Sequence, residues 1–456
     1  MNESLQQQRR RRLADAVAET GGGIAVISTG PEVMRNRDSD YPYRSDSYFY
    51  YLTAFPEPEA CVVVIAADGD RPARSVLFCR PKNPEREIWD GFRHGPDAVC
   101  ARFGFDAAYA IDELDAKMPE LLADQPAIHY LLGYDGALDE RVRCWLKAVR
   151  AKARSGVGAP VRLHDAAVLL DEFRLFKDKV ELNTMRRAAD ISAQAHRRIM
   201  QVAAPGRHEY EIEAELLYYF RKKGAAGPAY GSIVAAGANA CVLHYRANDQ
   251  LLHAGDLLLV DAGCELDGYA SDITRTIPIS GQFSDVQADI YEIVLAAQQA
   301  AIAAIRPGAA FNDAHDAALR MLAQGLLELG VCTGSVDDVI ESEAYKPFYM
   351  HRTSHWLGMD VHDCGRYQET AEPGASAAGA SSRRLQPGMV LTVEPGLYIR
   401  PADDIPRAYW NIGVRIEDDI AVTPDGCEVL SAYAPKDRLE IEALMRDART
   451  ASSATK

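Results

Sequence analysis

The chain has 456 residues, of which 48% are hydrophobic and 25% charged. This composition is that of a globular protein and excludes a collagen, a coiled coil or a wholly disordered chain. Asp and Glu outnumber Lys and Arg by 66 to 50, so the formal net charge is −16 and the cationic footprint of a nucleic-acid binder is missing. The sequence shows no apolar stretch near the roughly 18 residues of a membrane span. Neither nucleic acid nor a membrane is therefore expected as a partner.

The N-terminus and the cysteines indicate the compartment. Arg9 to Arg12 are followed at once by acidic residues and by no uninterrupted apolar run, which is a poor match to a signal peptide. We interpret these arginines as the solvated start of a helix. The nine cysteines are widely spaced without a Cys-x-x-Cys pair, a usage that indicates reduced thiols in a chain of this size. The sequence therefore predicts a cytoplasmic protein.

The N-terminal part alternates strand-like and helix-like segments, as an α/β domain does. Apolar runs predict buried strands at 23–29, 60–67 and 75–79, and an amphipathic pattern predicts a helix over 136–153. The segment 37–55 is rich in aromatic residues. It is interpreted either as a surface loop with a partly buried tyrosine cluster or as a loop that faces a ligand or another subunit, and the spacing does not choose between them.

Long helical periodicity begins near Phe176, so we predict an N-terminal domain over 1–175 and a second domain over 176–456. The first helix of the second domain ends at Ala-Pro-Gly, residues 204–206. The small and polar stretch 374–382 predicts a mobile loop. Further helices are expected at 209–223, 285–305 and 312–330, with strand pairs formed by 257–263 with 270–279 and by 389–394 with 412–423.

The two predicted strand pairs share one plan. In each, a glycine opens an apolar strand that ends in an acid, and the returning strand carries a second acid. The acids are Asp261 and Asp272 in the first pair, Glu394 and Glu417 in the second. This echo indicates a duplicated half-domain with a pseudo-twofold axis, and hence an α/β (α+β) architecture for the chain.

The spacing of the first acid pair predicts how the carboxylates lie. If Asp267-Gly268 forms a two-residue turn, residue 261 faces 274 and residue 272 faces 263. Because residues 261 and 263 share a face of the strand, both carboxylates then project the same way. A three-residue loop would instead place them on opposite faces. For any one acid taken alone, a salt bridge at the end of a strand remains the simpler interpretation.

Four of the chain's histidines strengthen the case for a metal. His351, His355 and His362 lie between the two acid pairs, and His244 precedes the first. Four carboxylates with one neutral imidazole provide mostly hard oxygen ligands, which suit Mn²⁺, Co²⁺, Fe²⁺ or Zn²⁺ in a paired site. Four carboxylates also offset the charge of two divalent cations. The sequence therefore predicts two divalent metal ions of one of these four kinds; the resemblance described below favours Mn²⁺.

Several segments resemble the pita-bread metallopeptidases, and within them the bacterial aminopeptidase P (Xaa-Pro aminopeptidase) family. The resemblance rests on VDAGCELDGYASDITRTIPI, HRTSHWLGMDVHD, LTVEPGLYI and IGVRIEDDI, and it extends to SDYPYRSDSYFYYLTAFPEPEA, EIWDG and LFKDKVELNTMRRA. The resemblance covers nearly the whole chain, from about residue 10 to residue 446. It implies an N-terminal domain of the aminopeptidase P type followed by a pita-bread catalytic domain. The stretch 374–382 departs from the family pattern as a modest insertion.

The resemblance implies a role for each site residue. The metal ligands would be Asp261, Asp272, His355, Glu394 and Glu417. Catalytic roles fall to Glu394 as the proton shuttle, to His362 as donor to the oxyanion and to His244 beside the departing prolyl nitrogen. The substrate-binding group would comprise His351, Tyr398 and Arg415, of which Arg415 is expected to orient an acid rather than touch substrate.

The implied activity is release of the N-terminal residue from peptides with proline in second position, by attack of a metal-bridging hydroxide. A prolidase restricted to Xaa-Pro dipeptides is the main alternative. The N-terminal domain argues against a methionine aminopeptidase. The intact ligand set argues against an inactive peptide-binding relative and a metal-free hydrolase of creatine-like substrates. A homo-oligomer, dimer or tetramer, is also expected, with segment 37–55 and Trp89 near a neighbour's active site.

Overall fold

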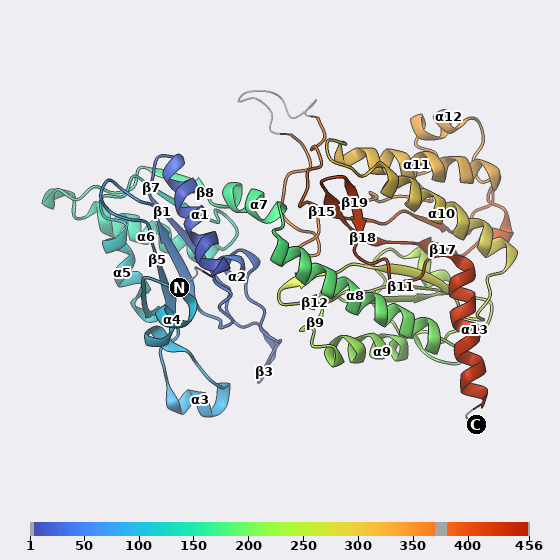
Figure 1. Ribbon diagram of the computed structural model, residues 1–456, viewed down its shortest axis with the longest axis horizontal. Helices are drawn as coiled ribbons and strands as arrows, with labels where there is room; N and C mark the ends of the chain where they lie inside the picture. The colour runs from blue at the N-terminus through green and yellow to red at the C-terminus, as the bar shows by residue number, and fades with distance from the viewer. Residues whose placement is uncertain (1–3, 370–380, 455–456) are drawn as a thin grey trace. The chain divides into compact units, whose positions relative to one another are not determined.

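The computed structural model describes residues 4–369 and 381–454. The chain divides into two compact units, Met1–Phe173 and Arg174–Lys456 (Figure 1). Most of the predicted mobile loop, residues 374–380, lies outside the described residues. The described helices include none that is long and apolar enough to cross a membrane.

The first unit is built on a mixed sheet with the strand order β6-β5-β4-β1-β7-β8. Strand β1 runs antiparallel to β4 and parallel to β7. The predicted strands at 23–29, 60–67 and 75–79 and the helix over 136–153 are confirmed as β1, β4, β5 and α6. The elements of this unit are α1 (Leu5–Glu19), β1 (Ile24–Ser28), β2 (Met34–Asn36), β3 (Ser39–Asp40), α2 (Ser47–Thr53), β4 (Cys61–Ile65), β5 (Arg74–Cys79), α3 (Pro84–Asp90), α4 (Gly95–Phe103), β6 (Ala107–Ala110), α5 (Leu114–Leu121), β7 (Ala127–Tyr130), α6 (Gly136–Arg150), β8 (Arg162–Asp165) and α7 (Ala167–Leu175), which continues into the second unit.

Two expectations for this unit were wrong in part, because tertiary contacts bury residues that the local sequence leaves polar or irregular. Arg9 to Arg12 do lie in a helix, and Arg11 and Arg12 are exposed as expected. Arg9 and Arg10 are buried, not solvated. Arg10 donates to the carbonyls of Leu52 and Phe103, so its hydrogen-bonding needs are met inside the protein. Within the aromatic segment 37–55, residues 47–53 form the buried helix α2 rather than a surface loop.

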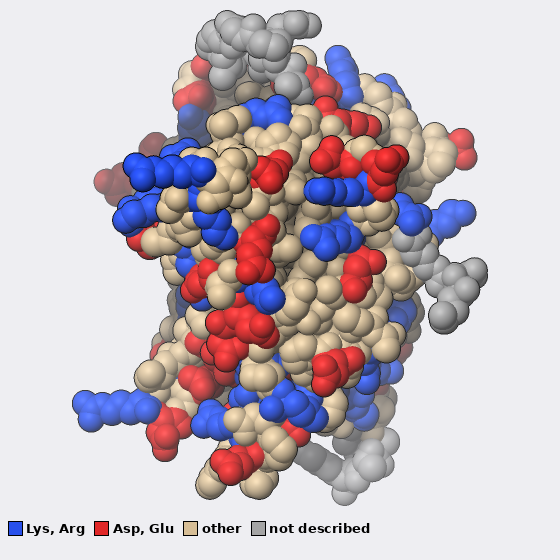
Figure 2. Space-filling view, turned by 90° about the vertical axis from the view of Figure 1, so that its left-hand side faces the viewer, with Lys and Arg blue, Asp and Glu red and all other residues tan. Residues whose placement is uncertain are grey.

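The surface of the molecule carries charges of both signs. On the face drawn in Figure 2, Lys and Arg side chains are interspersed with Asp and Glu. No large single-sign field covers this face, in keeping with the mixed composition of the sequence.

The second unit contains two helix pairs and two acid-bearing hairpins. Helix α8 starts where the Asp178 side chain accepts hydrogen bonds from the backbone N–H groups of Val180 and Glu181, a capping arrangement that satisfies the first free donors of a helix. The elements are α8 (Lys179–Val202), α9 (Glu209–Lys222), β9 (Gly227–Pro228), β10 (Ile233–Ala236), β11 (Leu257–Asp261), β12 (Cys264–Leu266), β13 (Tyr269–Ala270), β14 (Thr274–Pro278), α10 (Asp285–Ala304), α11 (Phe311–Glu328), α12 (Val336–Glu341), β15 (Val390–Val393), β16 (Gly396–Ile399), β17 (Ile412–Arg415), β18 (Asp418–Thr423), β19 (Gly426–Val429) and α13 (Arg438–Ala454).

The first hairpin has the predicted register. Asp267 and Gly268 both have positive φ, 50° and 82°, as a tight two-residue turn requires. Leu266 pairs with Tyr269 beside the turn, and Asp261 pairs with Thr274 farther along. The expected partner of Asp261 is therefore confirmed, and the same register on both sides places Asp272 opposite Gly263.

The second hairpin is interrupted at its acids. Strand β15 pairs with β18 and β16 pairs with β17, in one continuous register. Pro395 follows Glu394 and lies between β15 and β16, and a proline has no N–H with which to continue a ladder. The predicted pair of 389–394 with 412–423 is thus confirmed, with a break that frees Glu394 and Glu417 from regular strand structure.

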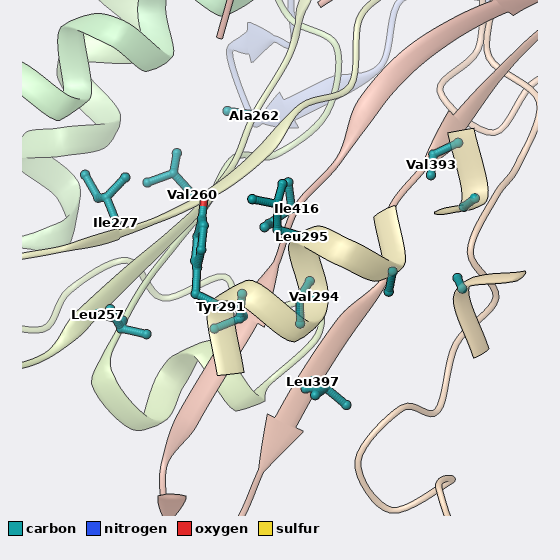
Figure 3. Close-up of a cluster of buried hydrophobic side chains, with 14 of the residues drawn as sticks. Leu257, Val260, Ala262, Ile277, Tyr291, Val294, Leu295, Val393, Leu397 and Ile416 are labelled. Carbon is teal, nitrogen blue, oxygen red and sulfur yellow. The ribbon is translucent and has the colours of Figure 1, made fainter. Parts of the chain in front are cut away.

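Helix α10 packs on the second hairpin and belongs to the same buried cluster as the first. Figure 3 shows its apolar face beside side chains of the first and the second hairpin. The labelled residues are Leu257, Val260, Ala262, Ile277, Tyr291, Val294, Leu295, Val393, Leu397 and Ile416, all of which belong to one buried cluster. Each hairpin follows its own helix pair, α8 and α9 or α10 and α11, so the predicted α/β (α+β) class is confirmed.

A side chain at Gly263 should destabilise the hairpin that holds the first acids. A Cβ at this residue would lie 1.6 Å from the carbonyl oxygen of Ser271, a backbone atom that cannot move aside. We expect Gly263→Ala to lower the free energy of unfolding by roughly 1–3 kcal/mol, the usual cost of overpacking, as measured by denaturant titration. Gly227→Ala is the matched control, because nothing lies within 4 Å of a Cβ there. Equal stabilities of the two variants would contradict this account.

Candidate metal centre

The acids and histidines singled out from the sequence line one cavity of about 520 Å³ in the second unit. Tyr398 lies behind this wall and contacts two of the lining residues. The predicted site residues that line the cavity are His244, Asp261, Asp272, His351, His355, His362, Glu394, Arg415 and Glu417.

The two acids of the first hairpin converge on Tyr230. The phenol of Tyr230 lies 2.6 Å from Oδ1 of Asp261 and also contacts Oδ1 of Asp272. A phenol carries a single proton and can donate to only one carboxylate at a time. Burial and the two carboxylates raise the pKa of Tyr230 well above its usual value, so it stays a donor.

Glu417 of the second hairpin bonds to the first hairpin next to Asp261. The hydroxyl of Thr274 donates to Oε2 of Glu417 at 2.7 Å, and the N–H of Glu417 donates to the carbonyl of Thr274 at 3.0 Å. Because Thr274 is the hairpin partner of Asp261, these bonds tie the two acid-bearing hairpins together at their acids.

His355 completes the group. Its Nδ1 lies 2.9 Å from the carbonyl oxygen of Trp356, so an N–H there donates to the backbone and directs Nε2 to the acids. Nε2 lies 3.5 Å from Asp272 and 3.7 Å from Glu394. Ligand atoms of Asp272, His355 and Glu417 all lie within 4.8 Å of one another, a spacing that can hold a metal ion.

The electrostatics of this cluster fit a cation. Burial, and then the neighbouring carboxylates, raise the pKa of Glu417 well above its usual value. Burial likewise raises the pKa of Glu394 to about 8. Burial also disfavours a charged Asp272, but hydrogen bonds from His355 and Tyr230 outweigh it and lower its pKa. Carboxylates held this close require protons or a cation between them, and the oxygen-rich donor set suits a hard divalent ion.

One arginine balances part of this negative charge. Arg415 donates to Oδ2 of Asp261 at 2.6 Å, to Thr274 at 3.1 Å and to the phenol of Tyr398 at 3.1 Å. The phenol of Tyr398 in turn contacts Nε2 of His351 at 2.8 Å. The guanidinium of Arg415 therefore donates to Asp261 and to Thr274 and Tyr398 beside it.

The remaining histidines differ in their surroundings. Burial and the charge of Arg415 lower the pKa of His351 to about 3, so its imidazole is neutral. His362 is exposed and its ring centroid lies 4.2 Å from that of His355. Desolvation and the nearby His355 lower its pKa. His244 is exposed on the cavity wall.

Sequence reasoning missed three residues that hold the acids. Besides Tyr230 and Thr274, Asp419 accepts hydrogen bonds from the N–H of Asp272 at 3.0 Å and from the hydroxyl of Ser271 at 2.8 Å. The predicted register already placed Thr274 opposite Asp261 and could have identified it. No spacing signal marked Tyr230, which comes from a separate segment of the chain.

Comparisons with known proteins identify the family. Residues 183–424, more than half of the chain, match the model of metallopeptidase family M24. The chain belongs to this family. Residues 6–129 match the aminopeptidase P N-terminal domain, so the resemblance seen in the sequence is confirmed, and with it the predicted order of an N-terminal domain and a pita-bread catalytic domain.

Several relatives in the family are similar over nearly their full length. The Xaa-Pro aminopeptidase of Escherichia coli is 43% identical, over 98% of this chain and 99% of that protein. Human Xaa-Pro aminopeptidase 3 is 32% identical, over 96% and 85%. The structure of Pseudomonas aeruginosa aminopeptidase PepP is 48% identical with a TM-score of 0.93, over 99% and 100% of the two chains. Zn-substituted E. coli aminopeptidase P in complex with product is 42% identical with a TM-score of 0.92, over 98% and 99%.

Metal binding should release protons at neutral pH. Without a cation, Glu394 with a pKa of about 8 and His355 with a pKa of about 9 carry protons at pH 7, whereas metal ligands must be deprotonated. Affinity for Mn²⁺ should therefore rise as pH increases through these two pKa values. Mn²⁺ should be titrated calorimetrically into protein freed of metal by a chelator, in two buffers of different ionisation enthalpy. The measured heats should differ, because the buffer takes up the released protons. Identical heats in the two buffers would contradict this electrostatic description.

Proposed function

We propose that this M24 metallopeptidase is an Xaa-Pro aminopeptidase, which releases the N-terminal residue from peptides whose second residue is proline. The observation that carries the proposal is the meeting of two acid-bearing hairpins and His355 in one cavity ringed by His244, His351 and His362. The proteins of E. coli and of humans that are similar over nearly their full length carry the same activity in their names.

The proposed cofactor is a pair of divalent metal ions, with Mn²⁺ as the preferred metal and Co²⁺, Fe²⁺ or Zn²⁺ as alternatives. Four carboxylates balance two divalent charges, and the close approach of the acids supports a paired rather than a single site. Zinc can be carried by a relative, since one similar structure is Zn-substituted. The residues that would hold the ions are Asp261, Asp272, His355, Glu394 and Glu417.

The chemistry supplied by bound divalent cations is polarisation of the scissile carbonyl, a lowered pKa for a bound water and anchoring of the substrate's free α-amine. The residues of the chain then handle the protons. Glu394 is suited to accept a proton and to return it, because burial holds its pKa near neutrality at about 8 and efficient acid–base groups titrate near the working pH.

The exposed histidines are assigned to the groups of the substrate that change charge during the reaction. A neutral imidazole at His362, consistent with its lowered pKa, offers an N–H to the oxyanion that forms on the attacked carbonyl. His244 is assigned to the departing prolyl nitrogen. Arg415 is assigned to holding Asp261 in place through their 2.6 Å hydrogen bond, and through Tyr398 it also orients His351.

Proline in second position follows from how substrate is held. A bond before proline has no N–H, so enzymes that bind substrate as an added β-strand lose a hydrogen bond there. A site that holds the free amine and packs the ring against His244 and His351 needs no such bond. Tyr398 was expected to touch substrate, but it is fully buried behind the wall and instead supports His351. The rigid ring also lowers the entropy cost of ordering the peptide.

A peptide panel tests the proposal. The protein with Mn²⁺ should cleave Xaa-Pro-Yaa far faster than Xaa-Ala-Yaa, as kcat/KM, and should release Xaa. Chelation should abolish turnover and Mn²⁺ should restore it. N-acetylation of the substrate should stop the reaction, because the amine can no longer be anchored.

Each arm of the panel has a result that contradicts the proposal. Comparable kcat/KM values for the proline and alanine peptides would show that the specificity is wrong. Cleavage of Xaa-Pro but not of Xaa-Pro-Yaa would make the protein a prolidase. Full activity after metal removal would exclude the metal-dependent mechanism.

The two structural units support the proposed division of labour. We assign residues 1–175 to the aminopeptidase P N-terminal domain and 176–456 to the catalytic domain, in line with the two family matches.

The cytoplasm is the proposed compartment, supported by the buried free thiols of Cys61, Cys79, Cys241 and Cys264.

We also propose a homo-oligomer, a dimer or a tetramer. Helix α3 exposes Ile88 and Trp89 at 81% and 83%, with Phe92 beyond it at 66%, and such apolar clusters mark interaction sites. Segment 37–55 and Trp89 would then lie near a neighbour's active site. Light scattering at micromolar concentration should give a mass at least twice that of the 50.0 kDa chain. A fully active monomer would be the contrary result.

A further inference from the structure

Two buried carboxylates outside the metal centre each contact the loop that carries an exposed histidine of the cavity. We propose that Asp363 and Glu209 are positioning residues, Asp363 for His362 and Glu209 for His244. The inference rests on the proposed function for the roles of the two histidines. Its structural basis, the tethering of each loop, is independent of that function.

The loop that bears His362 is closed by the next residue. The N–H of Asp363 donates to the carbonyl of Trp356 at 2.9 Å, and Oδ1 of Asp363 accepts from the N–H of Asp360 at 3.4 Å. The loop has no side chain at Gly358, where a Cβ would lie 2.1 Å from Oδ2 of Asp363. The carboxylate therefore occupies the interior of the loop.

Two buried cations hold that carboxylate. Arg174 donates to Oδ1 of Asp363 at 2.6 Å, and Nζ of Lys177 donates to Oδ2 at 2.9 Å. All three side chains are 1% exposed. Arg174 also donates to Asp360 at 2.7 Å. Charge-assisted hydrogen bonds of this kind are short and strong in a dry environment, so they fix the direction from which His362 enters the cavity.

Glu209 holds the loop of His244 from both sides. Oε1 accepts from the N–H of Ala236 at 2.7 Å and from the side chain of Asn239 at 3.1 Å, both of which precede His244. Oε2 accepts from the phenol of Tyr245 at 2.8 Å and from the N–H of Gln250 at 3.0 Å. Glu209 itself is fully buried.

The two carboxylates hold the segments of two different histidines. Each carboxylate bonds to the segment that flanks one histidine, and Asp363 is also held by Arg174 and Lys177. None of the bonds described above joins either carboxylate to a metal-ligand side chain. Loss of a tether should therefore misplace one histidine while leaving the ligands and the free-amine site in place. Small errors in the position of a reacting group reduce rates strongly.

Double-mutant cycles test the pairing. Asp363→Asn and Glu209→Gln keep the shape of each side chain and remove its charge. Each should lower kcat by roughly 10–100-fold, the usual effect of losing a supporting residue, with KM and bound metal close to wild type. His362→Ala and His244→Ala provide the reference losses, and that of His362→Ala should be on the order of 10²–10³, as for an oxyanion donor.

The cycles separate positioning from general destabilisation. Asp363→Asn should have almost no further effect on kcat in the His362→Ala background, yet its full effect in the His244→Ala background. Glu209→Gln should show the opposite pattern, so each variant is the control for the other. Equal fold-losses in both backgrounds would overturn the proposal, because they indicate a structural role.

Backbone hydrogen exchange provides a readout that does not depend on activity. Asp363→Asn should speed exchange of amides in residues 357–363 and not in 239–250, and Glu209→Gln should do the reverse. Unchanged exchange would overturn the tethers even if the enzyme cleaves Xaa-Pro peptides. Faster local exchange in a protein that does not cleave them would instead reject the proposed function and retain the tethers.

If Asp363→Asn fails to fold, Lys177→Met replaces it in the cycle. This variant removes one of the two cations, keeps an unbranched chain of similar length, and leaves Asp363 paired with Arg174. It should show the same coupling to His362 with a smaller loss of kcat. Coupling to neither histidine would count against the proposal.

Discussion

The mutual repulsion of four carboxylates in one cavity is the constraint on which this structure depends. Asp261, Asp272, Glu394 and Glu417 meet in one cavity, where burial makes each charge costly. The chain offsets only part of that charge, with Arg415 on Asp261 and with His355 beside Asp272 and Glu394. The remainder is what a divalent cation supplies, so the same electrostatic imbalance that opposes folding without metal creates affinity for it.

Two features of the backbone place the four acids in this cavity. Asp261 ends a buried strand, and the tight turn at Asp267-Gly268 sets the register that returns Asp272 to the same place. In the second hairpin, Pro395 interrupts the ladder beside Glu394. Both hairpins belong to one buried cluster with helix α10 (Figure 3), so one core fixes both pairs of acids. Acids placed beside the ends of packed strands are held closer to the narrow tolerances that catalysis needs than acids on free loops.

Support for the site comes from two groups of residues at different distances from the acids. Tyr230, Thr274 and Asp419 contact the acids themselves. Farther out, Asp363 and Glu209 bond to the loops of the cavity histidines. The inner residues set where the acids lie, and the outer carboxylates set where the exposed imidazoles lie. Ligand geometry and histidine placement therefore depend on different residues of one fold.

The sequence by itself determined the acid-bearing hairpins and their register, because a strand pattern of period two and an Asp-Gly turn are local properties. Its motifs also identified the family. Only the tertiary structure decided which distant residues complete the site. Tyr230 reaches both Asp261 and Asp272 from another segment, and the burial of Arg9 and Arg10 depends on carbonyls far along the chain. Such contacts follow from packing, which local periodicity does not encode.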